Sequence, residues 1–517
     1  MSQHLRIATT SHALPTRRAF RCLLPALLAC IATANALAGT LDDQLEKIIQ
    51  RSRLQLCNLG VVVMDASTGQ VLASNDPDDS FIPASNMKLF TSGAALASLG
   101  PDFAFETLLE LHEPEHDDQG NITGTRLVVR GSGDPAFADP ELLEMMNLGI
   151  EDLVTTWVNA AKDAGVTSID ELIVDARIFD DELVHPTWPV EQLNKWYCAE
   201  VSGLNVYTNV IRLFTSPNAP SEPPTVVMEP DAPWFRLNNR AVSVNRGQQT
   251  AWAARQHGTN IVTLYGDVRW AAEPIRVTIH DTPDFFGQLL ADRLRRAGVQ
   301  VKQVRAATAG DQLAPGRVLH VVRTPIDVVL KRCNTDSHNL YAECLLKRLG
   351  HDLTGTPGSW KNGAAAMRMI IPPKLSESAA NAVIVADGSG MSRSNRVTPR
   401  AIAEWLKALA DDPTLVDPFT DSLATPGDGT LERRFGDTQL VTELHAKSGY
   451  LTGVSSLSGY LVEPNTGQRV IFSILINNRP SNVPGRWIQD FWEEIVTMAD
   501  DYLAQQTGAT LAGVRER

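Results

Sequence analysis

The chain has 517 residues, of which 43% are hydrophobic and 21% are charged. That length exceeds a usual single domain, so two or three domains with buried cores are expected. The formal net charge is -14, and it becomes -18 without residues 1–38, which carry four arginines and no acidic residue. An acidic surface repels nucleic acid and anionic lipid, and no dense run of lysine or arginine offsets it. The composition therefore argues against a nucleic-acid partner.

Residues 1–38 are expected to be an export signal. A positive stretch ends at Arg17-Arg18, an apolar run covers Cys22–Ala34, and small residues follow. The apolar run is too short to span a bilayer, and cleavage is expected between Ala36 and Ala38. The paired arginines resemble a twin-arginine signal, although ordinary secretory signals also carry such pairs. A rival interpretation makes Cys30 a lipid attachment site, which leaves a very short apolar core.

The remaining cysteines are expected to be mostly unpaired and buried, with at most one disulfide. Four can pair in three ways, and the sequence does not choose among them. They are Cys57, Cys198, Cys333 and Cys344.

The first part of the mature chain alternates helix and strand patterns. Apolar spacing predicts a helix at Leu41–Ser52 and strands at Gly60–Asp65 and Gln70–Ser74. A helix-compatible stretch then runs from Ser85 to Leu99 and ends at Gly100-Pro101. Ser85 is therefore expected at a junction between a loop and a helix.

From about residue 102 to 280 the chain is expected to be an inserted region rich in strands. Its expected elements are a hairpin of Glu106–Leu111 and Thr125–Arg130, a helix at Asp152–Ala164, a strand at Ile169–Asp175 and proline-rich loops at Pro217–Pro233. A capped helix begins at Thr282-Pro283 and stops at Gly298. We therefore expect one domain, 39–101 plus 281–517, split by an insertion at 102–280 that holds two smaller nested domains.

A hydroxyl and an amine lie three residues apart in Ser85-Asn86-Met87-Lys88. On a helix this spacing puts both groups on one face. An unprotonated lysine can take the proton of a serine and turn it into a nucleophile, provided burial or nearby positive charge lowers its pKa. Taken alone, the pattern is also compatible with an exposed helix pair.

Two further short patterns could complete such a site. Ser337-His338-Asn339 precedes a helical run and can relay a proton and hold a substrate amide, or simply cap the helix. Lys447-Ser448-Gly449 opens a strand-like run at Tyr450–Tyr460. Its lysine and hydroxyl could grip a terminal carboxylate and its glycine allows close approach, or the pattern is a plain turn.

A zinc-protease string is present but is rejected. His112-Glu113-Pro114-Glu115-His116 has the two histidines and the glutamate of that motif. Pro114 lies inside the required helix, where it removes a backbone donor and clashes with the preceding turn. No metal site and no cofactor are expected.

The order and setting of the three patterns resemble the penicilloyl serine transferases. Further stretches resemble the class C low-molecular-mass penicillin-binding proteins, the D-Ala-D-Ala carboxypeptidase/endopeptidase family. These stretches are Gly131–Pro135, Val201–Asn205, Asp387–Arg393 and Gly429–Leu431. The resemblance covers nearly all of the mature chain, including the long stretch between Lys88 and Ser337, which are 249 positions apart. Such a gap is too large for a typical serine β-lactamase.

The resemblance implies an α/β (α+β) fold, with a β-lactamase-like catalytic domain split by a large β-rich insertion. It also implies roles for the residues of the three patterns. Ser85 would be the acyl-enzyme nucleophile, Lys88 its base, Ser337 and Asn339 the second motif and Lys447 the third, with Ser448, Gly449 and Tyr450 binding substrate. Backbone N–H groups of Ser85 and Tyr450 would hold the oxyanion. Ser448 departs from the threonine more usual in the family but keeps the hydroxyl.

The implied activity is that of a serine-type D-Ala-D-Ala carboxypeptidase/endopeptidase, a periplasmic hydrolase. Its expected partners are peptidoglycan stem peptides and β-lactam antibiotics. Two alternatives are a serine β-lactamase and a scaffold that binds penicillin without turnover. The balance of carboxypeptidase and endopeptidase action, the role of the insertion and a homo-oligomeric state stay open.

Overall fold

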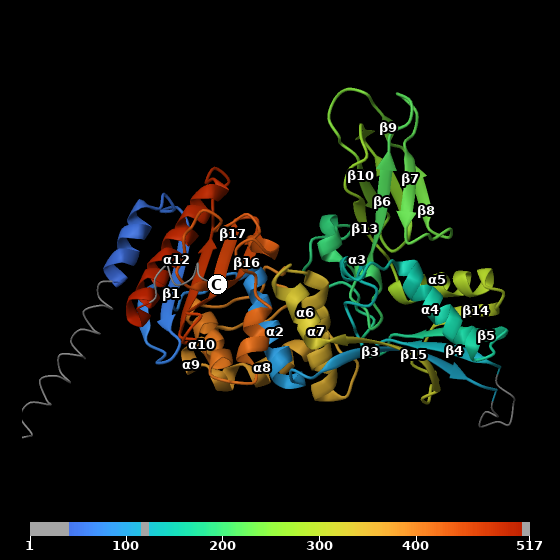
Figure 1. Ribbon diagram of the computed structural model, residues 1–517, viewed down its shortest axis with the longest axis horizontal. Helices are drawn as coiled ribbons and strands as arrows, with labels where there is room; N and C mark the ends of the chain where they lie inside the picture. Colours follow the sequence, from blue (N-terminus) through green and yellow to red (C-terminus); the bar gives the residue numbers. More distant parts are fainter. Residues whose placement is uncertain (1–40, 115–123, 509–517) are drawn as a thin grey trace, which may run out of the picture.

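The computed structural model describes residues 41–114 and 124–508, and the expected export signal lies outside these ranges. The chain forms two bodies that lie side by side along the longest axis, with α6 and α7 between them (Figure 1). Each body is built on a five-stranded sheet. Within the described residues, none of the helices combines the length and the apolar composition needed to cross a membrane.

The helices and strands have the following bounds. The strands are β1 Asn58–Asp65, β2 Val71–Asn75, β3 Ala104–His112, β4 Arg126–Arg130, β5 Ser168–Asp175, β6 Val210–Ser216, β7 Thr225–Glu229, β8 Arg236–Asn239, β9 Val242–Ser243, β10 Trp252–Arg255, β11 Ile261–Tyr265, β12 Asp267–Val268, β13 Ile275–Thr278, β14 Gln300–Ala306, β15 Arg317–Pro325, β16 Glu443–Leu451, β17 Val454–Val462 and β18 Arg469–Asn477. The helices are one over residues 41–51, then α2 Met87–Leu99, α3 Pro140–Met145, α4 Ile150–Asp163, α5 Thr282–Arg296, α6 Ile326–Asn334, α7 Asn339–Thr354, α8 Trp360–Ile370, α9 Glu377–Ala382, α10 Pro399–Ala410, α11 Val416–Asp421 and α12 Gly485–Thr507.

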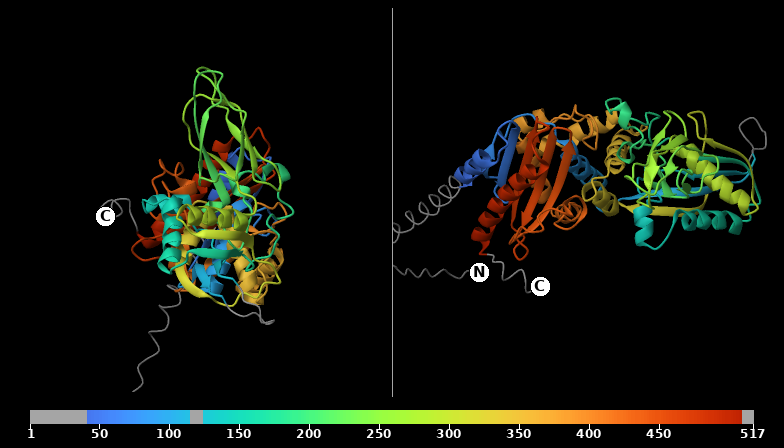
Figure 2. Two further views of the ribbon diagram at one scale, coloured as in Figure 1. Left: turned by 90° about the vertical axis from the view of Figure 1, so that its right-hand side faces the viewer. Right: turned by 90° about the horizontal axis from the view of Figure 1, so that it is seen from above.

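The first sheet is antiparallel and has the order β16-β17-β18-β1-β2. Both of its faces are covered, so β1 is apolar on both sides. Val61 and Val63 pack in one core cluster with α12 and the N-terminal helix, whereas Val62 and Met64 pack in another with α2 and α10. The covering of the sheet by helices on its two faces is visible in the second view of Figure 2.

The second sheet joins strands from both sides of position 280. Its order is β14-β5-β4-β3-β15, and β15 pairs with β3 along its length. Helix α5 packs in the same core cluster as the strands of this sheet. The residues from 282 to 325 therefore lie with the inserted region, which differs from the expected end at 280.

Three smaller sheets form the outer part of the inserted region. Their orders are β13-β6-β7, β10-β11-β8 and β12-β9, and they stand upright above the second sheet in Figure 1. The expected hairpin of β3 and β4 is present. The expectation of loops throughout Pro217–Pro233 is wrong, because β7 forms there as an edge strand against β6.

The strand expected over Tyr450–Tyr460 is in fact parts of two strands. β16 ends at Leu451, and β17 begins at Val454 and pairs back onto it. Gly453 has a φ of 78°, a left-handed conformation that favours glycine and closes the two-residue turn. The four cysteines at 57, 198, 333 and 344 are all free.

Candidate active site

Ser85 and Lys88 lie where a short 3-10 turn, η1 Ala84–Asn86, continues into α2. The Nζ atom of Lys88 donates to the Oγ atom of Ser85 at 3.2 Å. Gly390 packs against the carbonyl of Ala84. A Cβ at position 390 would lie 1.8 Å from that oxygen, so only glycine fits there. The sequence thus places the hydroxyl beside the amine as the helical spacing predicted.

The ammonium group of Lys88 is completely buried and has two further acceptors. It donates to Oδ1 of Asn339 at 2.7 Å and to the carbonyl of Ser389 at 2.8 Å. Burial lowers the pKa of Lys88 to about 8, and the charges of Glu343 and Asp387 oppose that effect. With that pKa, roughly a tenth of the lysine is neutral at pH 7, and the fraction able to act as a general base rises with pH.

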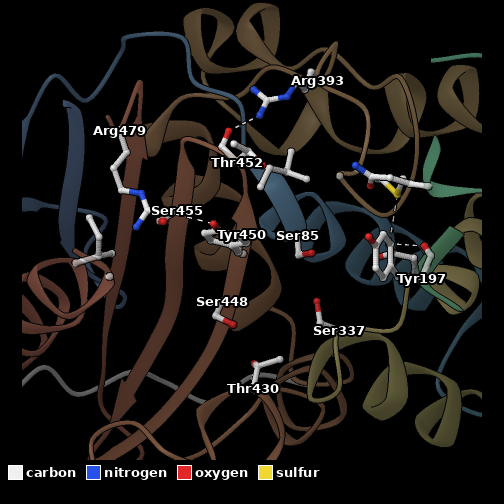
Figure 3. Close-up of a pocket in the computed structure, with 18 of the residues that line it drawn as sticks. Ser85, Tyr197, Ser337, Arg393, Thr430, Ser448, Tyr450, Thr452, Ser455 and Arg479 are labelled. Carbon is white, nitrogen blue, oxygen red and sulfur yellow. Dashed lines mark hydrogen bonds between the residues drawn. The ribbon is translucent and has the colours of Figure 1, made fainter. Parts of the chain in front are cut away.

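The second motif lies between α6 and α7. Ser337 adopts a φ of 60°, a strained conformation for serine, and its side chain faces the same cavity as Ser85 (Figure 3). Asn339 begins α7 and donates its Nδ2 to the carbonyl of Tyr197 at 2.8 Å. Tyr197 belongs to a short turn of the inserted region, so that region touches the amide that holds Lys88.

The third motif lies on β16, beside the nucleophile. Asn86 donates to the backbone carbonyl of Lys447 at 2.7 Å, which fixes the strand against η1. A Cβ on Gly449 would lie 2.7 Å from the backbone nitrogen of Ser85 and 2.3 Å from Oγ of Ser456. Glycine is thus required for the close approach of the protein's own chain segments.

Lys447 is completely buried and donates to the carbonyl of Ser448 at 2.8 Å. Burial, followed by the positive charges of Lys88 and Arg434, holds its pKa well below the usual range. Ser448 and Tyr450 line the cavity, Ser448 nearly buried and Tyr450 63% exposed. Every residue expected in the site is therefore within the cavity wall or directly behind it.

The cavity itself has a volume of about 970 Å³. Side chains from both bodies line it, including Trp196 and Tyr197 from the inserted region. Its charged lining consists of one acid, Asp336, and arginines at 393, 434 and 479. In a chain of net charge -14, this concentration of arginine marks a site for anionic groups.

One supporting residue, Glu343, was not among the residues that the sequence patterns singled out. Glu343 accepts hydrogen bonds from the backbone of Gly388 and Ser389 and from the indole of Trp360. It thereby holds the loop whose carbonyl binds Lys88. Burial, together with the charge of Asp387, raises the pKa of Glu343 to about 7. The stretch at 387–393 could have indicated this loop, since it was already singled out for its resemblance.

The architecture is that of a penicillin-binding protein. Penicillin-binding protein 4 (dacB) from Haemophilus influenzae has the same fold, with a TM-score of 0.69 and 20% identity over 90% of this chain and 99% of that one. The model of the D-Ala-D-Ala carboxypeptidase 3 (S13) family matches residues 41–498. The chain belongs to this family.

Two relatives extend the comparison over most of the sequence. The D-alanyl-D-alanine carboxypeptidase of Actinomadura sp. (strain R39) is 30% identical over 89% of this chain and 85% of its own length. The D-alanyl-D-alanine carboxypeptidase DacB of Haemophilus influenzae is 23% identical over 81% of this chain and 85% of its own length. The inserted region thus lies within the aligned part of both proteins.

Proposed function

We propose that this protein hydrolyses D-alanyl peptide bonds of peptidoglycan stem peptides through an acyl-enzyme on Ser85. The observation that carries the proposal is the buried Lys88 amine, 3.2 Å from the Ser85 hydroxyl and fixed by Asn339 and Ser389. Family membership and the names of the two carboxypeptidase relatives support the same reaction.

Acylation begins when neutral Lys88 takes the proton of Ser85. The Oγ atom then attacks the carbonyl carbon of the penultimate D-alanine, and the carbonyl oxygen becomes an oxyanion. The backbone N–H groups of Ser85 and Tyr450 stabilise that charge, a role supported by the close packing of β16 against η1.

Collapse of the tetrahedral intermediate breaks the C–N bond. The proton taken by Lys88 passes to the departing nitrogen, with Ser337 as the relay beside it, so that the leaving group departs as an amine. Water then attacks the ester with Lys88 again as base, which releases the acid and restores Ser85. Lys447 and Ser448 attract the carboxylate of the leaving group.

The same nucleophile opens β-lactams, because a lactam presents a strained amide to Ser85. We place the protein in the periplasm on the basis of the signal expected in residues 1–38. Export by the twin-arginine route is part of this proposal, and export assays test it. Both carboxypeptidase and cross-link endopeptidase action fit a cavity of this size.

Mass spectrometry of the intact protein tests the proposal. Incubation with penicillin should add one antibiotic mass at Ser85, and defined muropeptides should lose D-alanine or separate at the cross-link. Ser85→Ala should lose both properties, whereas Ser394→Ala, at an exposed serine on the same cavity wall, should keep them. Unlabelled wild type, or a label that persists in Ser85→Ala, would refute the assignment.

A further inference from the structure

The cavity continues past Ser448 to an end that the reaction described above does not use. In Figure 3, Ser448 and Thr430 lie on one side of Ser85, and Thr452 and Arg393 lie on the opposite side. Thr430 lines this end beyond Ser448, and Arg434 and Trp492 also line the cavity and contact each other. Because Lys447 and Ser448 attract the leaving group, this end lies on the leaving-group side of the scissile bond.

Arg434 is the cation of this end, and its guanidinium has no carboxylate partner among the described residues. The acid of the cavity, Asp336, follows the Thr335 that Thr430 contacts and is paired with Arg332 at 2.6 Å. Its Nη1 atom is buried without a hydrogen-bond partner, and its carbon Cζ lies 4.9 Å from the centre of the Trp492 ring. Burial lowers the pKa of Arg434, and only the charge of Glu493 opposes that effect. Arg434 is half-buried, and taking an unpaired guanidinium out of water is costly unless an anion balances its charge.

Its neighbours also lack acceptors. Thr430 Oγ1 and Trp492 Nε1 are buried without hydrogen-bond partners. Arg434, Thr430 and Trp492 thus all carry donors without protein acceptors at this end of the cavity.

This end of the cavity is fixed relative to the second motif. The 3-10 turn η6, Gly429–Leu431, lies against the end of α6, where the N–H of Thr430 donates to the carbonyl of Thr335 at 3.0 Å. Gly429 has a φ of 50°, and a Cβ there would lie 2.4 Å from the same carbonyl oxygen. Thr430 and Arg434 are thus held in place beside the loop that carries Ser337.

We propose that Arg434, together with Thr430, forms a subsite for the carboxylate of the leaving group. This inference rests on the proposed function and extends it to the side of the scissile bond that departs. The leaving group is an α-amino acid in both candidate reactions. It is free D-alanine in carboxypeptidase action and the D-centre of a diamino acid in cross-link cleavage, and each bears a carboxylate next to the freed amine.

Arg434 and Lys447 divide the recognition between them. The side chain of Lys447, on β16, is completely buried and already donates to a backbone carbonyl, whereas Arg434 lines the open cavity. A bound carboxylate offsets the mutual repulsion of the Arg434 and Lys447 cations, because each cation lowers the free energy of the bound anion. The subsite therefore favours substrates that end in a free acid over neutral ones.

The test compares a stem peptide ending in D-Ala-D-Ala with the same peptide as its C-terminal amide. The wild type should cleave the acid with the higher kcat/KM. Arg434→Met should reduce kcat/KM for the acid about 10- to 100-fold, the range expected for a lost hydrogen bond to a charged group, and change the amide by less than about 3-fold. Arg434→Lys should recover part of the loss for the acid.

Arg433→Met is the matched control, because it removes the same charge one residue away, where the side chain is 90% exposed. It should leave both substrates unchanged. Thr430→Val keeps nearly the same side-chain shape but removes the hydroxyl, so it should lower kcat/KM for the acid peptide and not for the amide. This variant still tests the subsite if Arg434→Met does not fold.

Equal losses for acid and amide in the folded Arg434 variants, or no loss for either, would overturn the subsite. Labelling of Ser85 by penicillin, measured by its extent in each variant, shows that the fold and nucleophile remain intact. If the wild type is neither labelled nor active on either peptide, the proposed function fails and the subsite fails with it.

Discussion

The guanidinium of Arg332 pairs with the carboxylate of Asp139 at 3.0 Å in a buried contact between the two bodies. Arg332 lies near the end of α6, and the N–H of His338, beside Ser337, donates to its carbonyl. Asp139 caps α3 in the inserted region and also accepts from the Tyr341 hydroxyl. The ion pair therefore ties the inserted region to the loop of the second motif.

Asp139→Asn should destabilise the protein, because it removes the negative charge that balances the buried guanidinium of Arg332. We expect the free energy of unfolding to fall by about 3 kcal/mol and the acylation rate to fall as Ser337 loosens. Chemical denaturation and the rate of penicillin labelling measure the two effects. Glu141→Gln is the control, since Glu141 pairs with the same guanidinium at 2.6 Å but is 46% exposed. Equal effects of the two substitutions would contradict this role.

Acylation should accelerate with rising pH, with a midpoint near the Lys88 pKa of about 8. The sign follows because the lysine acts as a base only when neutral, and it is protonated below its pKa. Penicillin labelling rates between about pH 6 and about pH 10 measure the midpoint. Lys88→Ala should lose about 100- to 10,000-fold in rate and show no such midpoint. A profile shared by mutant and wild type would assign the base elsewhere.

Glu343→Gln should move that midpoint to lower pH. Once ionised above its own pKa of about 7, Glu343 stabilises protonated Lys88, so its removal makes the lysine easier to deprotonate. The maximal rate should also fall, because glutamine can accept only part of the hydrogen bonds that Glu343 receives. Glu377→Gln, at the exposed start of α9, should leave the profile unchanged. An unmoved midpoint in Glu343→Gln would refute the coupling.

Gly449→Ala should abolish most acylation while the protein stays folded. The added methyl would collide with Ser85 N and Ser456 Oγ, so β16 must move away from the nucleophile. Gly436→Ala serves as the control, because a Cβ there has no atom within 4 Å. Thermal unfolding and penicillin labelling separate a displaced strand from a lost fold. Normal labelling in Gly449→Ala would show that the close approach is dispensable.

The sequence predicted local structure well where one pattern decides it. The spacing in Ser85–Lys88 put hydroxyl and amine on one face, and the structure has them in hydrogen-bond contact. The sequence did not predict the break within Tyr450–Tyr460, because strand-forming residues lie on both sides of it and its one local mark is Gly453, which takes a left-handed conformation. Apolar periodicity reports the type of an element but not a two-residue reversal inside it.

Contacts between distant segments could not be predicted. The helical pattern of α5 is the same whichever sheet it covers, so the sequence did not reveal that it packs with the inserted region. Tyr197 contributes a backbone carbonyl, which any residue type possesses. The pairing of Asp139 with Arg332 spans 193 positions and has no local signature.

The pairing of β1 with β18 joins Asn58 to Asn477 and so constrains the order in which the chain can fold. Strands β1 and β2 leave the ribosome roughly 400 residues before β18, the strand that lies between β1 and β17 in the sheet. Closing such a long loop is slow. The inserted region has its own core, drawn from residues 109–301, and can fold in that interval. A chain truncated before β18 would leave one edge of β1 unpaired and open to aggregation, with no strand to join β17 to β1.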